Sequence, residues 1–183
     1  MLGRVAVLWC VCGWLSSALS APEDYNIKVD VMQQGNVFHT QASFYLPLTQ
    51  CQAYRYLTDY DAATRIPGVA ASTTTRLDAR KVRVERQLRE RILFFPINMR
   101  MVLEVSELPN QGTDFVQLSG EAKSHKGSWR LESDANGTRF RYRAESEPDS
   151  IFPKAVVEYF IKSRLHGSFE AMAKAGAERQ QPC

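Results

Sequence analysis

Arg86 is the residue of this sequence whose type and position most suggest chemistry. It falls on the same face of an alternating segment as Val82 and Val84, where an isolated charge is costly unless it is paired. One interpretation is a guanidinium that meets the polar headgroup or carboxylate of a ligand. The other is a bulge that turns Arg86 outward, or an ion pair with Glu90 or Glu104. The sequence favours the second interpretation, because strand register is easily misassigned by one residue.

A general acid or base is hard to find elsewhere. Three residues could serve inside an apolar interior: Arg86, Glu90 and Tyr142. The histidines form no catalytic set, since His39 alternates to a polar strand face, His125 lies in a Lys-Ser-His-Lys loop, and His166 lies on a solvated helix row. No His/Cys/Asp spacing suits zinc, and no Gly-rich turn suits phosphates. We therefore expect no catalytic set, no metal site and no cofactor.

The first twenty residues are typical of a secretory signal peptide. Residues 1–4 form a short basic start, 5–15 an apolar run, and 16–20 a series of small residues. The apolar run is shorter than the ~20 residues that a membrane-spanning helix needs. We expect residues 1–20 to be cleaved and 21–183 to form one exported, periplasmic domain with no membrane span.

Cys51 and Cys183 lie outside this segment. Export would place both in an oxidising compartment, where two thiols tend to pair. A bridge would close almost the whole domain and contribute up to ~4–5 kcal/mol in the chain-entropy account. The alternative is two unpaired thiols, one in a helix and one on the C-terminal tail, and the sequence leaves both open.

The overall charge argues against a nucleic-acid partner. The 183 residues include 23 Lys and Arg against 20 Asp and Glu, for a net charge of +3. The basic residues alternate with acidic ones instead of clustering into a patch.

Period-two alternation of apolar and polar residues predicts the strands that must position Arg86. It runs through residues 25–32, 37–46, 82–92, 99–106 and 139–144. Such alternation is typical of antiparallel strands with one buried face. Asn136-Gly137 predicts a two-residue hairpin turn before the last strand.

Helices are predicted in two places. Thr49 can cap a short helix, and a second short turn starts at Asp61 and breaks at Ile66-Pro67-Gly68. A long helix is predicted over residues 152–177, with a charged outer row at every fourth position. Its wide apolar arc indicates that it is mostly buried.

One helix is too narrow to cover the sheet that these strands imply. A helix is ~10–12 Å across, whereas strands repeat every ~4.8 Å. The uncovered apolar face must curl around the helix, meet a second subunit, or enclose a cavity. We expect an α+β fold: a curved antiparallel sheet of about six to seven strands around a long C-terminal helix, with two short helices after the first long strand.

Several short motifs accompany this order of elements. They are residues 57–61 (LTDYD), 66–69 (IPGV), 127–131 (GSWRL), 137–142 (GTRFRY) and 151–153 (IFP). Over residues 37–177 the chain resembles the START-like (helix-grip, SRPBCC) superfamily, and within it the polyketide cyclase and coenzyme Q-binding group. The resemblance implies a hydrophobic tunnel between the sheet and the C-terminal helix.

Candidates for the wall of that tunnel are apolar residues and a tyrosine on the predicted inner faces. With Arg86 they are Met99, Met101, Trp129, Phe140, Tyr142, Phe152, Val156 and Phe160. Methionine suits an adaptable apolar surface, and tyrosine adds a polar tip. The alternative for each of them is a place in an ordinary core.

We therefore expect an exported binding or carrier protein for an apolar small molecule such as a lipid, a quinone or a polyketide-like compound. One alternative is a cyclase or dehydratase that uses the same cavity. Another is an interaction module that docks a protein partner of the cell envelope, with a well-packed, empty interior.

Overall fold

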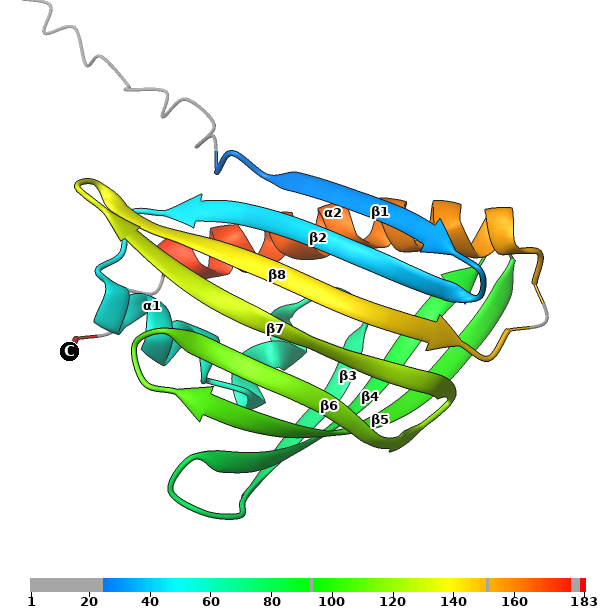
Figure 1. Ribbon diagram of the computed structural model, residues 1–183, viewed down its shortest axis with the longest axis horizontal. Coiled ribbons are helices and arrows are strands. Elements are labelled where there is room, and N and C mark those ends of the chain that lie inside the picture. The colour runs from blue at the N-terminus through cyan, green and yellow to red at the C-terminus, as the bar shows by residue number, and fades with distance from the viewer. Residues whose placement is uncertain (1–24, 93, 151, 179–181) are drawn as a thin grey trace, which may run out of the picture.

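The computed structural model describes residues 25–92, 94–150, 152–178 and 182–183 (Figure 1). The predicted signal peptide, residues 1–20, lies outside these described residues. Within them, no helix is both long and apolar enough to cross a membrane.

Eight antiparallel strands form a single curved sheet (Figure 1). In chain order they are β1 (Lys28–Gln34), β2 (Val37–Leu46), β3 (Val69–Arg76), β4 (Lys81–Ile92), β5 (Phe95–Leu108), β6 (Gly112–Gly120), β7 (Ala122–Asp134) and β8 (Gly137–Pro148). Across the sheet the order is β1-β2-β8-β7-β6-β5-β4-β3. Edge strand β3 lacks a clear alternation, because its sequence VAASTTTR is rich in small polar residues. This explains a sheet slightly larger than predicted.

The helices lie where the sequence predicts them. α1 (Gln50–Leu57) begins at a capping box, in which Thr49 Oγ1 accepts from the Gln52 backbone and Gln52 Oε1 accepts from the Thr49 backbone at 3.0 Å. A short 3-10 helix, η1 (Asp61–Arg65), follows. The long helix α2 (Lys154–Glu178) closes the fold and confirms the α+β, helix-grip prediction.

The hairpin between β7 and β8 turns one residue earlier than predicted. Its turn residues are Ala135 and Asn136, because Asp134 pairs with Gly137. The Asp134 carboxylate accepts hydrogen bonds from the backbone N–H groups of Asn136 (2.9 Å) and Gly137 (3.1 Å). These bonds fix the turn in that register.

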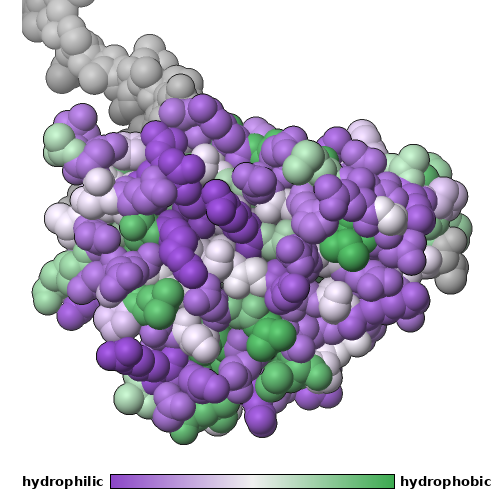
Figure 2. Space-filling model, viewed as in Figure 1, coloured by the Kyte–Doolittle hydropathy of each residue, from purple (hydrophilic) through white to green (hydrophobic). Residues whose placement is uncertain are grey.

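The convex face of the sheet is mostly hydrophilic, with scattered apolar residues (Figure 2). Ion pairs link neighbouring strands there, including Arg141–Glu132 at 2.7 Å and Lys126–Glu145 at 2.9 Å. Exposed pairs of this kind contribute at most ~1 kcal/mol each. These ion pairs lie on the solvent-exposed face that the alternating pattern predicts.

Helix α2 packs mainly on the part of the concave face formed by β1, β2 and β8, and it reaches β7 through Phe169, which lies 5.7 Å from Trp129 (Figure 1). Near its start, Val157 packs with Val31 and Phe38. Farther along, Phe169 and Ala173 pack in a cluster that includes Phe44, Leu46 and Phe140. The inner faces of β4, β5 and β6 carry a separate cluster made of Val82, Val84, Leu103, Val105 and Phe115. The helix thus leaves the second half of the sheet free to face a cavity.

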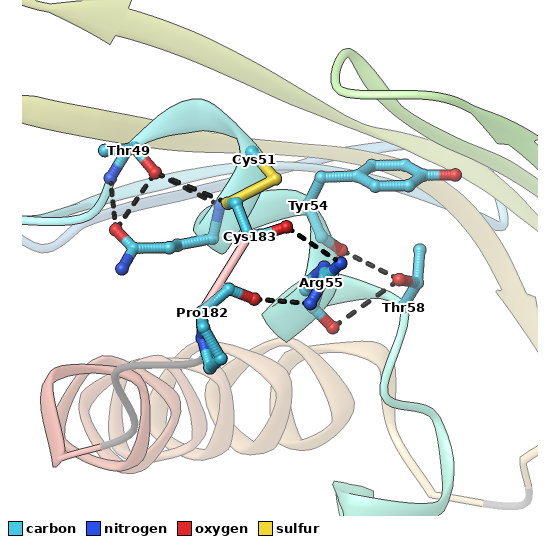
Figure 3. Close-up of a disulfide and its surroundings, with 8 residues drawn as sticks. Thr49, Cys51, Tyr54, Arg55, Thr58, Pro182 and Cys183 are labelled. Atoms are coloured by element: carbon cyan, nitrogen blue, oxygen red, sulfur yellow. Dashed lines mark hydrogen bonds between the residues drawn. A yellow bond between two sulfur atoms is a disulfide. The ribbon is translucent and has the colours of Figure 1, made fainter.

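Cys51 in α1 and Cys183 form a disulfide, with their Cα atoms 6.0 Å apart (Figure 3). Arg55, one turn along α1, donates to the backbone carbonyls of Pro182 and Cys183, the latter at 3.3 Å. The chain end is therefore held against α1 by covalent and polar contacts. Of the two alternatives that the sequence leaves open, the structure contains the bridge.

Candidate functional site

A cavity of about 300 Å³ lies between the concave face of the sheet and the C-terminal half of α2. Most of its wall is apolar: Val84, Leu88, Met101, Leu103 and Phe115 from the sheet, Leu165, Phe169 and Met172 from α2, and Ile66 and Pro67 after η1. Small-molecule sites are typically concave, mostly apolar and marked by a few polar groups. This cavity has that character.

Three aromatic rings close one side of the cavity. Trp129 and Tyr142 lie with ring centroids 4.9 Å apart, and Phe169 of α2 lies 5.7 Å from Trp129 and 5.6 Å from Tyr142. Phe115 stacks on Tyr142 at 5.9 Å. Each such aromatic contact contributes ~0.5–1.5 kcal/mol beyond the burial of its area. These contacts join the sheet to α2 on this side of the cavity.

Arg86 projects into this cavity. It lies opposite Met101 in an uninterrupted β4–β5 register, so it shares the inner face with Val82 and Val84. Its Nε is buried and has no hydrogen-bond partner. Within the described part of the chain, no residue forms a hydrogen bond or ion pair with its side chain.

The interpretation of Arg86 that the sequence favoured is therefore wrong. No bulge interrupts β4 against β5 at this position. The two acidic candidates have other partners, because Glu90 pairs with Arg164 at 2.7 Å and Glu104 with Lys81 at 3.0 Å. The guanidinium is left facing the cavity.

Burial and the Arg86 charge set the protonation states of the side chains around Arg86. Burial lowers the pKa of the Arg86 guanidinium, but an arginine stays protonated in proteins. Burial raises the pKa of Tyr142, against the opposing effect of Arg86. The pKa of His125 falls from its ordinary 6.5 to about 4, because of burial and then the Arg86 charge. At neutral pH the cavity therefore holds one buried cation beside a neutral phenol and a neutral imidazole.

His125 is a site residue that the sequence analysis missed. It lies on β7 and not in a loop, lines the cavity, and its Nδ1 is 2.6 Å from Ser146 Oγ of β8. The Phe115 ring lies 5.1 Å from the imidazole. A signal was present, because His125 lies four positions before Trp129, and residues an even number of positions apart share a strand face.

A second polar cluster lies at another edge of the cavity. The Tyr60 hydroxyl donates to Glu107 Oε1 at 3.1 Å, and Arg76 pairs with Glu107 at 3.1 Å. Burial and the Glu107 charge raise the pKa of Tyr60, so its hydroxyl stays a donor. The Glu107 carboxylate is therefore bound by two side chains of the protein itself and is not available to a ligand.

The other predicted wall residues divide into two groups. Met101, Trp129 and Tyr142 line the cavity. Not among the lining residues are Met99, Phe140, Phe152, Val156 and Phe160. Phe140 stacks on Phe44 at 4.7 Å in the core, and Phe152 contacts Phe95 at 5.9 Å. The first turns of α2 pack on β1 and β2, so the cavity begins only farther along the helix.

The fold and this cavity define a START-like protein, with a curved sheet around a long C-terminal helix. Residues 46–173 match the family described as polyketide cyclase / dehydrase and lipid transport. The chain belongs to this family, and the resemblance inferred from its sequence is confirmed. Among curated proteins, no match was found.

Solved structures share the fold at low sequence identity. A STAR-related lipid transfer protein from Xanthomonas axonopodis superposes with a TM-score of 0.70 at 17% identity, covering 85% of this chain and 96% of that one. The Zhui aromatase/cyclase from Streptomyces sp. R1128 gives 0.66 at 11% identity, with 78% and 95% covered. TTHA0849 from Thermus thermophilus gives 0.65 at 15% identity, with 76% and 94% covered. At these identities the likeness shows the fold alone.

Proposed function

We propose that this protein binds and carries an apolar small molecule in the cavity between the sheet and α2. The observation that carries the proposal is the cavity itself, which is lined mostly by apolar side chains where α2 does not pack on the inner faces of β4, β5 and β6. Burying apolar ligand surface contributes ~25 cal/mol per Å² before the costs of ordering. A lipid, a quinone or a polyketide-like compound would all supply such surface.

We also propose that the protein acts after export. Residues 1–20 have the order of a secretory signal. The Cys51–Cys183 disulfide supports the same proposal, since disulfides persist in oxidising compartments. A carrier at that location would hold its ligand away from water outside the cytoplasm.

Native mass spectrometry of the protein recovered from the exported fraction without detergent tests this proposal. We expect a stoichiometric adduct that organic extraction releases and that can then be identified. A bare mass from several independent preparations, together with a stably co-purifying exported protein, would instead favour the interaction module.

Two serines of α2 provide a matched pair of variants for the same experiment. Ser168 lines the cavity, whereas Ser163 is exposed on the same helix. Ser168→Phe should fill the cavity and abolish the adduct, while Ser163→Phe should retain it. Equal adducts in both variants would show that the ligand lies elsewhere.

A second candidate function is that of a cyclase or dehydratase in the same cavity. It is favoured by one observation, the neutral His125 imidazole facing the cavity that also holds the Arg86 charge. A neutral imidazole can remove a proton next to a carbonyl, and a guanidinium can stabilise the resulting enolate. We would incubate the protein with a poly-β-ketone thioester and look for a cyclised product that has lost water. His125→Gln should abolish this turnover and spare binding.

A further inference from the structure

We infer that the ligand of this cavity is an amphiphile with a single carboxylate, and that Arg86 binds this carboxylate. The inference rests on the proposed binding function and narrows it to a chemical class. It starts from the one buried cation of the lining, whose Nε has no partner among the described residues. A buried charge with no counter-charge is costly in the empty protein. A ligand anion would remove that cost on binding.

Among the described residues no acidic side chain forms an ion pair with Arg86, and this includes Asp59, which also lines the cavity. The buried carboxylate of Glu107 is bound by Arg76 and Tyr60. Glu90, at the rim of the cavity, is bound by Arg164. Both acids are therefore satisfied in the empty protein, whereas Arg86 is not.

The neighbours of Arg86 indicate the charge of the ligand headgroup. His125 and Tyr142 line the same cavity as neutral groups at neutral pH. The other arginine of the lining, Arg65, is exposed at the rim. A single buried guanidinium matches a monoanion better than a doubly charged phosphate ester. Its planar fork fits the two oxygens of a carboxylate in a bidentate arrangement.

The remaining wall indicates the rest of the molecule. Asp59, Glu90, Thr113 and Ser168 also line the cavity, but most of the remaining lining is aliphatic or aromatic and suits an uncharged hydrocarbon tail. A volume of about 300 Å³ is at the small end of ligand cavities. A carboxylate with a tail of medium length fits both features.

Trp129 makes the test direct. It lines the cavity, and the other tryptophans, Trp9 and Trp14, lie in the predicted signal peptide. Its fluorescence in the chain of residues 21–183 should therefore respond to binding. Decanoate, decanol and decylamine share one tail and differ in headgroup charge. At neutral pH we expect decanoate to bind at least ~10-fold more tightly than decanol, and decylamine the least tightly.

Two arginines of β4 give the matched variants. Arg86→Met should abolish the preference for decanoate over decanol, while Arg83→Met, on the exposed face of the same strand, should keep it. The thermal midpoint of unliganded Arg86→Met should equal or exceed that of the original protein, because an uncompensated buried charge is removed. Arg86→Lys keeps the positive charge and should retain a weaker preference for decanoate over decanol. This variant tests the inference if Arg86→Met fails to fold.

The outcomes separate this inference from the function on which it rests. Equal binding of decanoate and decanol, unchanged by Arg86→Met, would overturn the carboxylate assignment and leave an apolar carrier. A preference for decylamine would overturn it too. If no ligand alters Trp129 fluorescence and native mass spectrometry gives a bare mass, the binding function itself fails.

Discussion

Arg164 of α2 and Glu90 of β4 form an ion pair at 2.7 Å that joins the helix to the half of the sheet that it does not cover. The Glu90 side chain is only 13% exposed, compared with 40% for Arg164. Gly68 lies against the pair with φ +91°, and a Cβ at this position would lie 1.9 Å from Glu90 Oε1. The Arg164–Glu90 pair thus connects α2 to β4 at the rim of the cavity, and the missing side chain of Gly68 leaves room for it.

Removal of Arg164 should destabilise the fold, because it leaves the mostly buried Glu90 carboxylate unpaired. We expect Arg164→Met to lower the free energy of unfolding by about 1–3 kcal/mol. Lys162→Met, which breaks an exposed pair with Glu158 on the same helix, should cost less than about 0.5 kcal/mol. Urea denaturation measures both, and Glu90→Met should rescue Arg164→Met. Equal losses in the two single variants would contradict this role of the pair.

The two glycines of α2 should respond in opposite ways to the same substitution. A Cβ at Gly167 meets nothing within 4 Å, so Gly167→Ala should stabilise the protein by up to about 1 kcal/mol through helix propensity. A Cβ at Gly176 would lie 2.5 Å from Leu46 Cδ1 and 3.2 Å from the Tyr56 ring. Gly176→Ala should therefore lower the thermal midpoint, despite the same gain in propensity. A stabilised Gly176→Ala would show that α2 can move away from β2 at no cost.

His125 should make the stability of the protein depend on pH. Its pKa of about 4 in the folded chain is below its ordinary 6.5, so between these values the unfolded state binds more protons. This contribution is complete above pH 6.5 and is lost as the pH falls to about 4, by up to about 3 kcal/mol. Denaturant titrations across this range should show a shallower decline for His125→Gln. His166→Gln, at an exposed position of α2, should follow the original curve.

Reduction of the Cys51–Cys183 bridge should destabilise the fold without changing its architecture. The bridge spans 132 residues, and closing so long a loop contributes up to ~4–5 kcal/mol in the chain-entropy account. Cys51→Ser, Cys183→Ser and the double variant should lose the same amount, since each removes one shared bond. Unfolding under oxidising conditions measures this loss, and intact mass confirms two fewer hydrogens in the parent. Additive losses in the double variant would mean that the two thiols act separately.

Arg86 and His125 are the two site residues whose environment could not be predicted from the sequence. Alternation placed Arg86 on an inner strand face. Its lack of an acidic partner depended on the ion pairs that Glu90 and Glu104 form with Arg164 and Lys81. His125 lies within a polar run, so its even spacing from Trp129 becomes informative only once β7 is known to pair with β8, with His125 opposite Ser146. Charge pairing across strands is set by register and by neighbouring elements, which local patterns do not contain.

The sequence by itself determined the fold class, the helices and five of the eight strands, but not the bounds of β3, β6 and β7. Period-two alternation defined these five strands, Thr49 and Gln52 defined the start of α1, and the charged row defined the outer face of α2. These features depend on contacts between near neighbours in the chain. Only the tertiary structure decided that Phe140 lies in the core and Arg86 faces the cavity, because the placement of α2 depends on packing between distant residues such as Val31 and Val157.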